Sequence, residues 1–364
     1  MEGWAAQARL PEFPWDRLAP YGETARAHAD GIVDLSIGTP VDPTPEVVQA
    51  ALRAGSDAPG YPVTVGTPAL RAAITGWVRR RLGATVSEAE VVPSIGSKEL
   101  VALLAQLLGV HGKQVLLPAL AYPTYDVGAR LAGCEPVPTD DPTAHDPAQV
   151  GLVWLNSPSN PTGEVIGAER LRAVVDWARS HGVLVASDEC YLELGWDAEP
   201  VSVLHPSVSG GSTEGLLALH SLSKRSNLAG YRSGFAVGDP RAVALLVEAR
   251  KHIGLLPPGP VQAATVAALG DDAHVAEQKE RYRARRDALR TAVEKAGFRV
   301  DHSEAGLYLW VTRDEACWDT VSWLAERGVL AAPGAFYGEA GARHVRMALT
   351  ATDERIAAAA ARLA

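Results

Sequence analysis

The sequence predicts an α/β protein with one large, mostly parallel, doubly wound sheet and a second, smaller α+β domain. Short apolar runs bounded by turn residues recur through the first part of the chain, and helical stretches lie between several of them. After about Pro257 the pattern changes to long helices with isolated strands. A length of 364 residues is also long for a single core and suits two domains.

The elements of the first part follow from periodicity and turn signals. Apolar residues at helical spacing predict helices over 45–52 and 67–82, and a further helix over 168–180 separates two apolar runs. The short apolar runs themselves are typical of strands that are buried on both faces. The predicted strands are 115–117, 152–155, 183–186, 216–219 and 234–237.

The second part predicts a different kind of unit, in which helices outnumber strands. The predicted helices are 261–269, 273–296, 318–327 and 353–363, and the predicted strands are 298–301 and 307–311. We therefore divide the chain into three parts. Residues 1–40 form an N-terminal segment that packs with the small domain, 41–270 form the large domain, and 271–364 form the small domain.

Composition narrows the class of protein. The net charge of -9 argues against a general nucleic-acid binder, which usually carries a basic face. The three cysteines, Cys134, Cys190 and Cys317, show no metal-ligand spacing, and such a sparse set suits a reducing compartment. We find no signal peptide and no apolar run long enough for a bilayer. The expectation is a soluble, cytoplasmic protein without a metal, a nucleic-acid partner or a membrane partner.

A serine-rich motif around Lys224 carries the strongest chemical signal. Ser221-Leu222-Ser223-Lys224 directly follows a predicted strand, and ligands of open α/β sheets bind where strands end. A lysine there becomes a nucleophile if its pKa is lowered. Arg232 follows eight residues later and could clamp a phosphate in bidentate fashion. Taken alone, the motif is equally compatible with a surface loop that carries two ordinary cations.

Two further motifs follow strands in the same way. Asp188, in Ser187-Asp188-Glu189-Cys190-Tyr191, is a carboxylate at a buried strand end, which is costly without a cationic or protonated partner. The stretch 156–163 reads Asn-Ser-Pro-Ser-Asn-Pro-Thr-Gly, and its two X-Pro bonds restrict the backbone. Considered singly, a helix cap and a tight turn explain these two motifs at least as well.

Together, the order and spacing of the three motifs resemble the fold type I pyridoxal-phosphate aminotransferases. The resemblance covers nearly the whole chain. It implies that Lys224 forms the Schiff base with pyridoxal 5'-phosphate and shuttles a proton, and that Asp188 pairs with the pyridinium nitrogen. The other cofactor contacts that it implies are Asn160 and Tyr191 to the ring O3′, Tyr122 stacked on the ring, and Gly96, Ser97, Lys98, Ser221, Ser223 and Arg232 around the phosphate.

The same resemblance implies contacts to the substrate and to a second subunit. Arg346 stands in an otherwise apolar stretch, where an arginine is costly unless it meets an anion, and it matches the arginine of the family that binds the α-carboxylate. Gly38 would lie beside the same carboxylate. Tyr61 resembles the tyrosine that reaches the phosphate of the neighbouring subunit. The expected assembly is therefore a homodimer with shared active sites, and the expected substrates are amino acids and keto acids.

The amino-acid sequence of several longer stretches is similar to that of actinobacterial succinyldiaminopimelate aminotransferases. These stretches are 14–16, 34–43, 120–130 and 188–191. The resemblance implies that glutamate aminates N-succinyl-2-amino-6-oxopimelate on the route to diaminopimelate and lysine. Because this acceptor carries several carboxylates, a distal cation is needed. We take Lys98 as the first candidate and Arg225 as the second, although either could be an ordinary solvated cation.

Three alternatives stay open at this point. The chain could be another class I or II aminotransferase, of the aspartate, aromatic or acetylornithine type. It could also be a pyridoxal-phosphate β-lyase or decarboxylase, since these enzymes use the same lysine and aspartate. A non-catalytic, aminotransferase-like regulator is the remote alternative, and the lack of a basic segment or of room for a winged helix before Asp34 argues against it.

Overall fold

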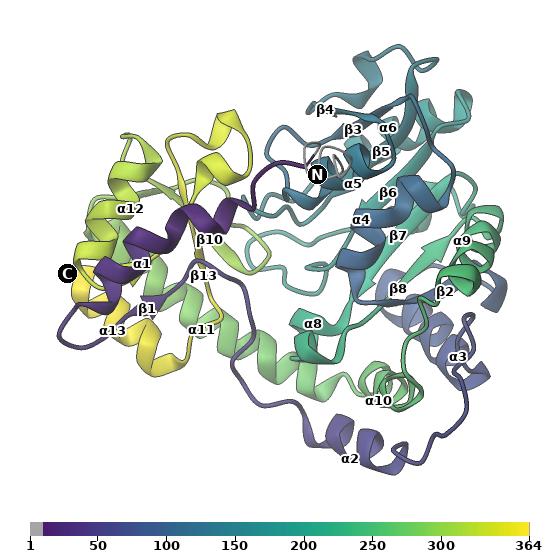
Figure 1. The fold of residues 1–364 in the computed structure, drawn as a ribbon, viewed down its shortest axis with the longest axis horizontal. Helices are drawn as coiled ribbons and strands as arrows, with labels where there is room; N and C mark the ends of the chain where they lie inside the picture. Colours follow the sequence, from purple (N-terminus) through teal and green to yellow (C-terminus); the bar gives the residue numbers. More distant parts are fainter. Residues whose placement is uncertain (1–9, 364) are drawn as a thin grey trace, which may run out of the picture.

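The computed structural model describes residues 10–363, in which a seven-stranded sheet, a four-stranded sheet and a two-stranded sheet are present (Figure 1). The larger sheet lies in the teal and green part of the chain, between residues 91 and 238. The four-stranded sheet, with the helices in yellow-green, lies on the other side of the molecule, and the purple N-terminal segment runs along it. Within residues 10–363, no helix combines the length and the apolar character needed to cross a bilayer.

Seven strands form the larger sheet in the order β2-β8-β7-β6-β5-β3-β4. β8 is antiparallel to both of its neighbours, and the other pairs are parallel. The sheet is therefore mostly parallel and doubly wound, as the sequence predicts. The strands are β2 (Val91–Ile95), β3 (Gln114–Leu117), β4 (Glu135–Pro138), β5 (Val150–Asn156), β6 (Leu184–Asp188), β7 (Leu216–Ser221) and β8 (Ser233–Gly238).

Helices bury both faces of this sheet, which explains why its strands read as continuous apolar runs. One face packs on α4 (Ser97–Leu107), α5 (Thr124–Leu131) and α9 (Pro240–Ile253). The other face packs on α3 (Pro68–Trp77), η3 (Val78–Leu82), α6 (Ala168–Ser180), α7 (Pro206–Ser209) and α10 (Gly259–Gly270). α2 (Glu46–Ala54) lies against α10.

The smaller unit has its own core around an antiparallel sheet of order β12-β13-β10-β9. The N-terminal segment joins this core, because β1 pairs with β11 in parallel and Leu18 is buried there. Its strands are β9 (Arg299–Val300), β10 (Tyr308–Thr312), β11 (Val329–Leu330), β12 (Ala332–Pro333) and β13 (Val345–Ala348). The other elements are α1 (Ala19–Arg26), β1 (Val33–Asp34), α11 (Ala273–Lys295), α12 (Cys317–Glu326) and α13 (Asp353–Leu363).

The predicted strands and helices are present, but several further elements were not predicted and one predicted helix changes character before its end. The sequence analysis missed β2, which contains Pro93; a proline is tolerated there because β2 is an edge strand. Among the longer elements, α1, β4, α5 and α9 were not predicted either. The helix expected over 67–82 changes at Val78 into η3, whose hydrogen bonding is that of a π-helix. The domain limits at 40/41 and 270/271 stay predictions, and residues 1–9 of the expected N-terminal segment lie outside the described part.

The close contact between α4 and α5 gives a stability prediction. A Cβ placed on Gly128 of α5 would lie 2.6 Å from the carbonyl oxygen of Val101 on α4. We expect Gly128→Val to lower the free energy of unfolding by about 1–3 kcal/mol, because the two helices must separate. Urea unfolding measures this loss. Gly167→Ala is the matched control, since nothing lies within 4 Å of its added Cβ, and equal losses for both variants would contradict the prediction.

Candidate active site

A cavity of about 610 Å³ opens at the carboxyl ends of β5, β6 and β7. This is where open α/β sheets bind ligands, since the strand ends bring side chains from separate loops to one edge. Residues of the smaller unit, including Tyr308, close its other side. Of the residues singled out in the sequence, the cavity is lined by Gly38, Ser97, Lys98, Tyr122, Asn160, Asp188, Tyr191, Ser221, Ser223, Lys224, Arg232 and Arg346.

Lys224 stands on α8 (Leu222–Arg225), a single helical turn that directly follows β7. Its side chain points into the cavity, and its ammonium donates a short hydrogen bond to the carbonyl oxygen of Gly38. Burial lowers the pKa of Lys224, and the nearby guanidinium groups of Arg346 and Arg232 lower it further. The arrangement therefore favours a neutral, nucleophilic amine at a lower pH than an exposed lysine would show.

Asp188 ends β6 and is buried. The hydroxyl of Tyr125 donates to its Oδ2 at 2.9 Å, and the backbone N–H of Cys190 donates to Oδ1 at 3.2 Å. Burial raises the pKa of Asp188, and these two hydrogen bonds oppose the rise. Because no basic side chain in residues 10–363 forms an ion pair with it, this carboxylate would gain stability from a cationic or protonated group in the cavity.

Asn156, at the end of β5, connects the strand ends. Its side-chain amide donates to the backbone carbonyl of Asp188 at 2.9 Å, and its own oxygen accepts from the backbone N–H of Asn160 at 2.7 Å. A buried amide that satisfies groups of two neighbouring loops fixes their relative position. The side chain of Asn160 is thereby presented at the cavity wall.

Arg346, on β13, enters the cavity from the smaller unit and is buried. Its guanidinium donates to Oδ1 of Asn160 at 2.8 Å and to the carbonyl oxygen of Ser36 at 2.7 Å. It also lies 3.9 Å from the ring centre of Tyr308. The hydroxyl of Tyr308 is 3.0 Å from that of Tyr191. With no carboxylate among these partners, the guanidinium can accept an anionic ligand.

Arg232 and the start of α4 form a cradle suited to an anion. Gly96 caps α4 with a φ of 72°, and a Cβ at this position would lie 2.4 Å from Nη2 of Arg232. Glycine suits this position because of its positive φ, and a side chain there would also displace the guanidinium; Gly96 is not itself among the lining residues. Ser97, at the first helical position, and the hydroxyl groups of Ser221 and Ser223 face the same region. A helix amino terminus, hydroxyls and an arginine together fit a phosphate.

The outer part of the cavity is mostly apolar. Tyr122 lines it, with the ammonium of Lys98 5.9 Å from its ring centre. Phe13 and Ile37 line it too, and their side chains remain 56% and 51% exposed, so both are available to a bound ligand. This wall lies in the N-terminal segment from Leu10 to Trp15 and in the loop around Gly38.

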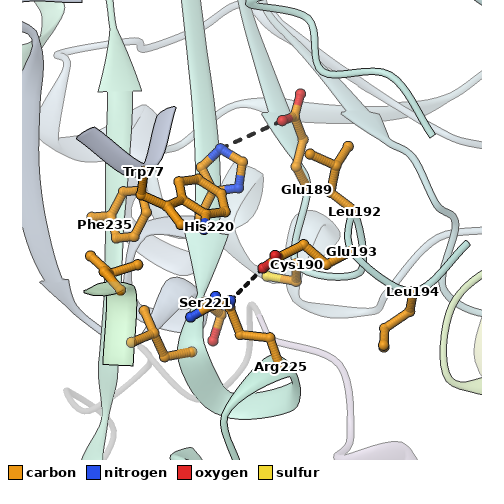
Figure 2. Close-up of a pocket in the computed structure, with 12 residues that line it drawn as sticks. Trp77, Glu189, Cys190, Leu192, Glu193, Leu194, His220, Ser221, Arg225 and Phe235 are labelled. Carbon is orange, nitrogen blue, oxygen red and sulfur yellow. Dashed lines mark hydrogen bonds and ion pairs between the residues drawn. The ribbon is translucent and has the colours of Figure 1, made fainter. Parts of the chain in front are cut away.

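The structure corrects the second candidate for a distal cation. Arg225 follows Lys224 directly, yet its side chain points away from the large cavity into a separate space of about 10 Å³ (Figure 2). There it forms an ion pair with Glu193. Successive residues of a helical turn face different directions, so the neighbour of a cavity residue need not reach the same cavity. Arg225 is therefore unavailable to the ligand of the large cavity.

A buried histidine–carboxylate pair lines the same small space. Nε2 of His220 lies 3.5 Å from Oε2 of Glu189. Burial raises the pKa of Glu189 to about 7 and lowers the pKa of His220 to about 3. Despite the short distance, the pair is therefore not a full ion pair, because burial keeps His220 neutral and Glu189 only partly ionised at neutral pH. Glu189 and Asp188 are successive residues at a strand end, so they face opposite sides of the sheet.

The lining residues that were not predicted from the sequence include Tyr125, Tyr308, Asn156 and Ile37. Tyr125 was visible as the second aromatic residue of the Tyr122 motif, and Asn156 as a polar side chain at the end of a predicted strand. Tyr308 carries no such signal, because an aromatic residue in a short strand is usually a core residue. Tyr61 is 97% exposed and does not line the cavity of its own chain.

Comparisons with known proteins agree with one another. The family described as aminotransferase class I and II matches residues 30–363. The transaminase OxyQ of Streptomyces rimosus, which acts on 4-dedimethylamino-4-oxo-anhydrotetracycline, is 59% identical over 97% of this chain and 99% of its own. A probable aminotransferase of Mycobacterium tuberculosis, Rv1178, is 62% identical over 98% of this chain and 86% of its own.

Solved structures show the same fold. The structure of a probable N-succinyldiaminopimelate aminotransferase from Thermus thermophilus superposes with a TM-score of 0.87. It is 29% identical in sequence, and the match covers 96% of this chain and 99% of that chain.

The environment of Lys224 gives a prediction that needs no ligand. In the protein free of cofactor, we expect Lys224 to react with an amine-specific acylating reagent at a lower pH than an ordinary lysine, because burial favours its neutral form. Peptide mass spectrometry across a pH series measures the midpoint, and the exposed Lys251 calibrates the reagent. A midpoint at or above the ordinary lysine value would contradict the prediction.

Proposed function

The chain belongs to the class I and II aminotransferases, a pyridoxal-phosphate-dependent family, and we propose that its large cavity transfers an amino group from glutamate to N-succinyl-2-amino-6-oxopimelate. The observation that carries the catalytic part is the convergence of Lys224, Asp188 and Arg232 on one cavity. The similarity to a probable N-succinyldiaminopimelate aminotransferase supports the choice of acceptor. The wider assignment, an aminotransferase, does not depend on that choice.

The residues of the cavity fit pyridoxal phosphate. Asp188 has no cationic partner among residues 10–363 and would meet the protonated ring nitrogen, while Arg232, Ser221, Ser223 and the start of α4 would hold the phosphate. The other proposed contacts are Asn160 and Tyr191 to the ring oxygen, Tyr122 to the ring face, and Gly96, Ser97 and Lys98 as the first residues of the phosphate loop. When bound, the cofactor supplies an electron sink that stabilises negative charge at the substrate Cα.

Lys224 has two proposed roles, covalent attachment of the cofactor and proton transfer. Its lowered pKa makes the amine nucleophilic, and the same amine, once released, can take the proton from the substrate Cα. The hydrogen bond to Gly38 holds Nζ between the two units of the chain. Asn160 and Tyr308 hold Arg346 where it can bind the α-carboxylate, with Gly38 beside it.

Two observations favour a second candidate acceptor. OxyQ, which is 59% identical, acts on a ketone of the tetracycline skeleton. The outer wall of the cavity here is apolar and includes Phe13 and Ile37, which suits a flat polycyclic substituent better than several carboxylates. A β-lyase or decarboxylase would also use Lys224 and Asp188, so keto-acid dependence of the reaction is the discriminating observation.

We also propose that the protein acts as a homodimer in which Tyr61 completes the site of the partner subunit. The side chain of Tyr61 is almost fully exposed in the single chain, and Val63 beside it is 52% exposed. Exposed apolar side chains of this kind suit a protein interface. A shared site would explain why a phosphate-binding residue lies outside its own cavity.

The first test is turnover with glutamate and a panel of keto acids. The panel contains the succinylated oxopimelate, N-acetylornithine semialdehyde, an aromatic keto acid and a polycyclic ketone. We expect Lys224→Ala to reduce kcat by at least about 10⁴-fold and to abolish covalent attachment of the cofactor, read by mass spectrometry after borohydride reduction. Turnover that does not require a keto acid would contradict transamination, and equal rates across the panel would contradict the choice of acceptor.

Lys98 tests the proposed distal contact. We expect Lys98→Ala to raise KM for the succinylated acceptor by about tenfold, since one charge-assisted hydrogen bond is lost. KM for a small keto acid whose only charge is its α-carboxylate should stay within about twofold, because Arg346 rather than Lys98 is proposed to bind that group. An unchanged KM for the succinylated acceptor would remove Lys98 from this role.

Subunit mixing tests the shared site. Tyr61→Ala and Lys224→Ala should each be weakly active or inactive alone. In a mixed dimer, one of the two sites combines the intact Lys224 of one chain with the intact Tyr61 of the other, so random exchange should restore roughly a quarter of the wild-type activity. Steady-state rates after unfolding and joint refolding measure this. No recovery above the sum of the separate variants would contradict a site shared in this way.

A further inference from the structure

Arg225 and Glu193 are unused by the mechanism above, although both are buried beside the lysine turn (Figure 2). Their side chains are 6% and 7% exposed. A buried arginine is costly unless it is paired and hydrogen-bonded. Arg225 meets this condition, because besides Glu193 it donates to the carbonyl oxygen of Ala268 at 3.2 Å and to the hydroxyl of Ser226 at 3.1 Å.

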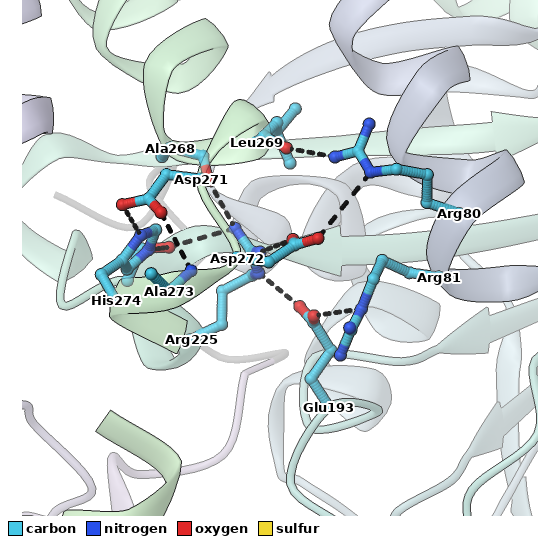
Figure 3. Close-up of polar contacts among 11 residues, drawn as sticks. Arg80, Arg81, Glu193, Arg225, Ala268, Leu269, Asp271, Asp272, Ala273 and His274 are labelled. Carbon is cyan, nitrogen blue, oxygen red and sulfur yellow. Dashed lines mark hydrogen bonds and ion pairs between the residues drawn. The ribbon is translucent and has the colours of Figure 1, made fainter. Parts of the chain in front are cut away.

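The pair belongs to a chain of alternating charges that joins three parts of the fold (Figure 3). Nε of Arg81, on η3, lies 2.9 Å from Oε1 of Glu193. Asp272, at the start of α11, lies 4.0 Å from Arg225 and 3.8 Å from Arg80. The lysine turn is thereby tied both to η3, which packs against the large sheet, and to the point where the chain enters α11.

A second set of contacts joins the lysine turn to the start of α11. His274, on the first turn of α11, contacts the hydroxyl of Ser226 at 2.8 Å and the carboxylate of Asp271 at 3.0 Å. Burial lowers the pKa of His274, and the nearby Arg225 lowers it too. Ser226 directly follows Arg225, so α8 is fixed to α11 by two neighbouring residues.

The connection between α8 and α11 matters because α11 is part of the core of the smaller unit. Its later residues, such as Tyr282 and Leu289, are buried in the core of the smaller unit, the core to which β13 and Arg346 also belong. α8 by itself is a single turn of four residues, too short to hold its shape without outside contacts. Arg225 supplies those contacts, and Lys224 is the adjacent residue.

We propose that Arg225 and Glu193 are positioning residues that couple the placement of Lys224 to the smaller unit. The ion pair fixes the turn to the loop of Glu193, whose next residue, Leu194, is buried in the core of the smaller unit. Arg225 also approaches Asp272 at the start of α11. These contacts keep the amine of Lys224 enclosed and at a set place relative to Arg346. This inference rests on the proposed role of Lys224 in transamination. The ion pair touches neither substrate nor cofactor, and it acts only through the geometry of α8.

The test compares Arg225→Gln, Glu193→Gln and the double variant. Glu193→Gln removes one charge at nearly constant shape, and Arg225→Gln replaces the charged guanidinium with a shorter, neutral amide. We expect each single variant to raise the reaction midpoint of Lys224 in the cofactor-free protein toward the ordinary lysine value, since a looser turn admits water. In the loaded enzyme, kcat should fall on the order of tenfold while KM for glutamate stays within about twofold. The double variant should lose little more than either single one.

Controls separate positioning from general instability. Arg241→Gln removes an arginine that pairs with Asp239 and Glu214 at the far end of β8, and it should change neither the midpoint nor kcat. Arg225→Lys keeps the charge and should recover part of kcat. If Arg225→Gln does not fold, Glu193→Gln carries the test.

Two outcomes would overturn the proposal. The first is a Lys224 midpoint and a kcat unchanged in both single variants, even if their melting temperatures fall, since the ion pair would then be purely structural. The second is a double variant whose loss equals the sum of the single losses. Because the midpoint is measured without cofactor or substrate, these outcomes are distinguishable from a failure of the transamination proposal itself.

Discussion

The desolvation of charged groups at one edge of the large sheet is the constraint on which the rest of the structure depends. Burial acts in opposite directions on the two central groups, because it raises the pKa of Asp188 and lowers the pKa of Lys224. Both shifts favour the neutral forms. A bound group with a protonated ring nitrogen would restore the charge on Asp188, and a carbonyl would consume the free amine of Lys224. The cavity thus disfavours the ionised forms of Asp188 and Lys224 when it is empty. A ligand that pairs with Asp188 or reacts with Lys224 removes this cost, and its binding is favoured for that reason.

The fold creates this constraint by bringing strand ends together. Asn156, Asp188 and Ser221 each end a strand, and β5, β6 and β7 are neighbours in the sheet. At each end, the adjacent residue faces the opposite side, which is why Glu189 and His220 form a separate buried pair beneath the site. The smaller unit then supplies Arg346 and Tyr308, so neither unit holds the complete set of groups.

The sequence predicted the fold class and most of the polar lining residues because motifs report local chemistry at strand ends. Lys224, Asp188 and Asn160 each follow an apolar run, and their order along the chain is a property of sequence. Contacts between residues that are distant in the sequence produce no recognisable sequence motif. The hydrogen bond from Tyr125 to Asp188 spans 63 positions, and the contact between Tyr191 and Tyr308 spans 117. The error at Arg225 has the same origin, since adjacency to Lys224 says nothing about which side of a helical turn faces the cavity.

The substrate is the least predictable feature because its contacts come from segments outside the motifs. Phe13, Ile37 and Lys98 lie on the N-terminal segment, the loop around Gly38 and α4. Among the described lining residues, Arg346 and Arg232 have proposed anions, which leaves Lys98 for any distal carboxylate, while Glu12 lines the same cavity with the opposite charge. A second distal carboxylate would therefore gain little attraction. On charge alone, the outer cavity therefore suits the second candidate acceptor, with its apolar body, while the proposal of N-succinyl-2-amino-6-oxopimelate rests on the similarity to the probable N-succinyldiaminopimelate aminotransferase.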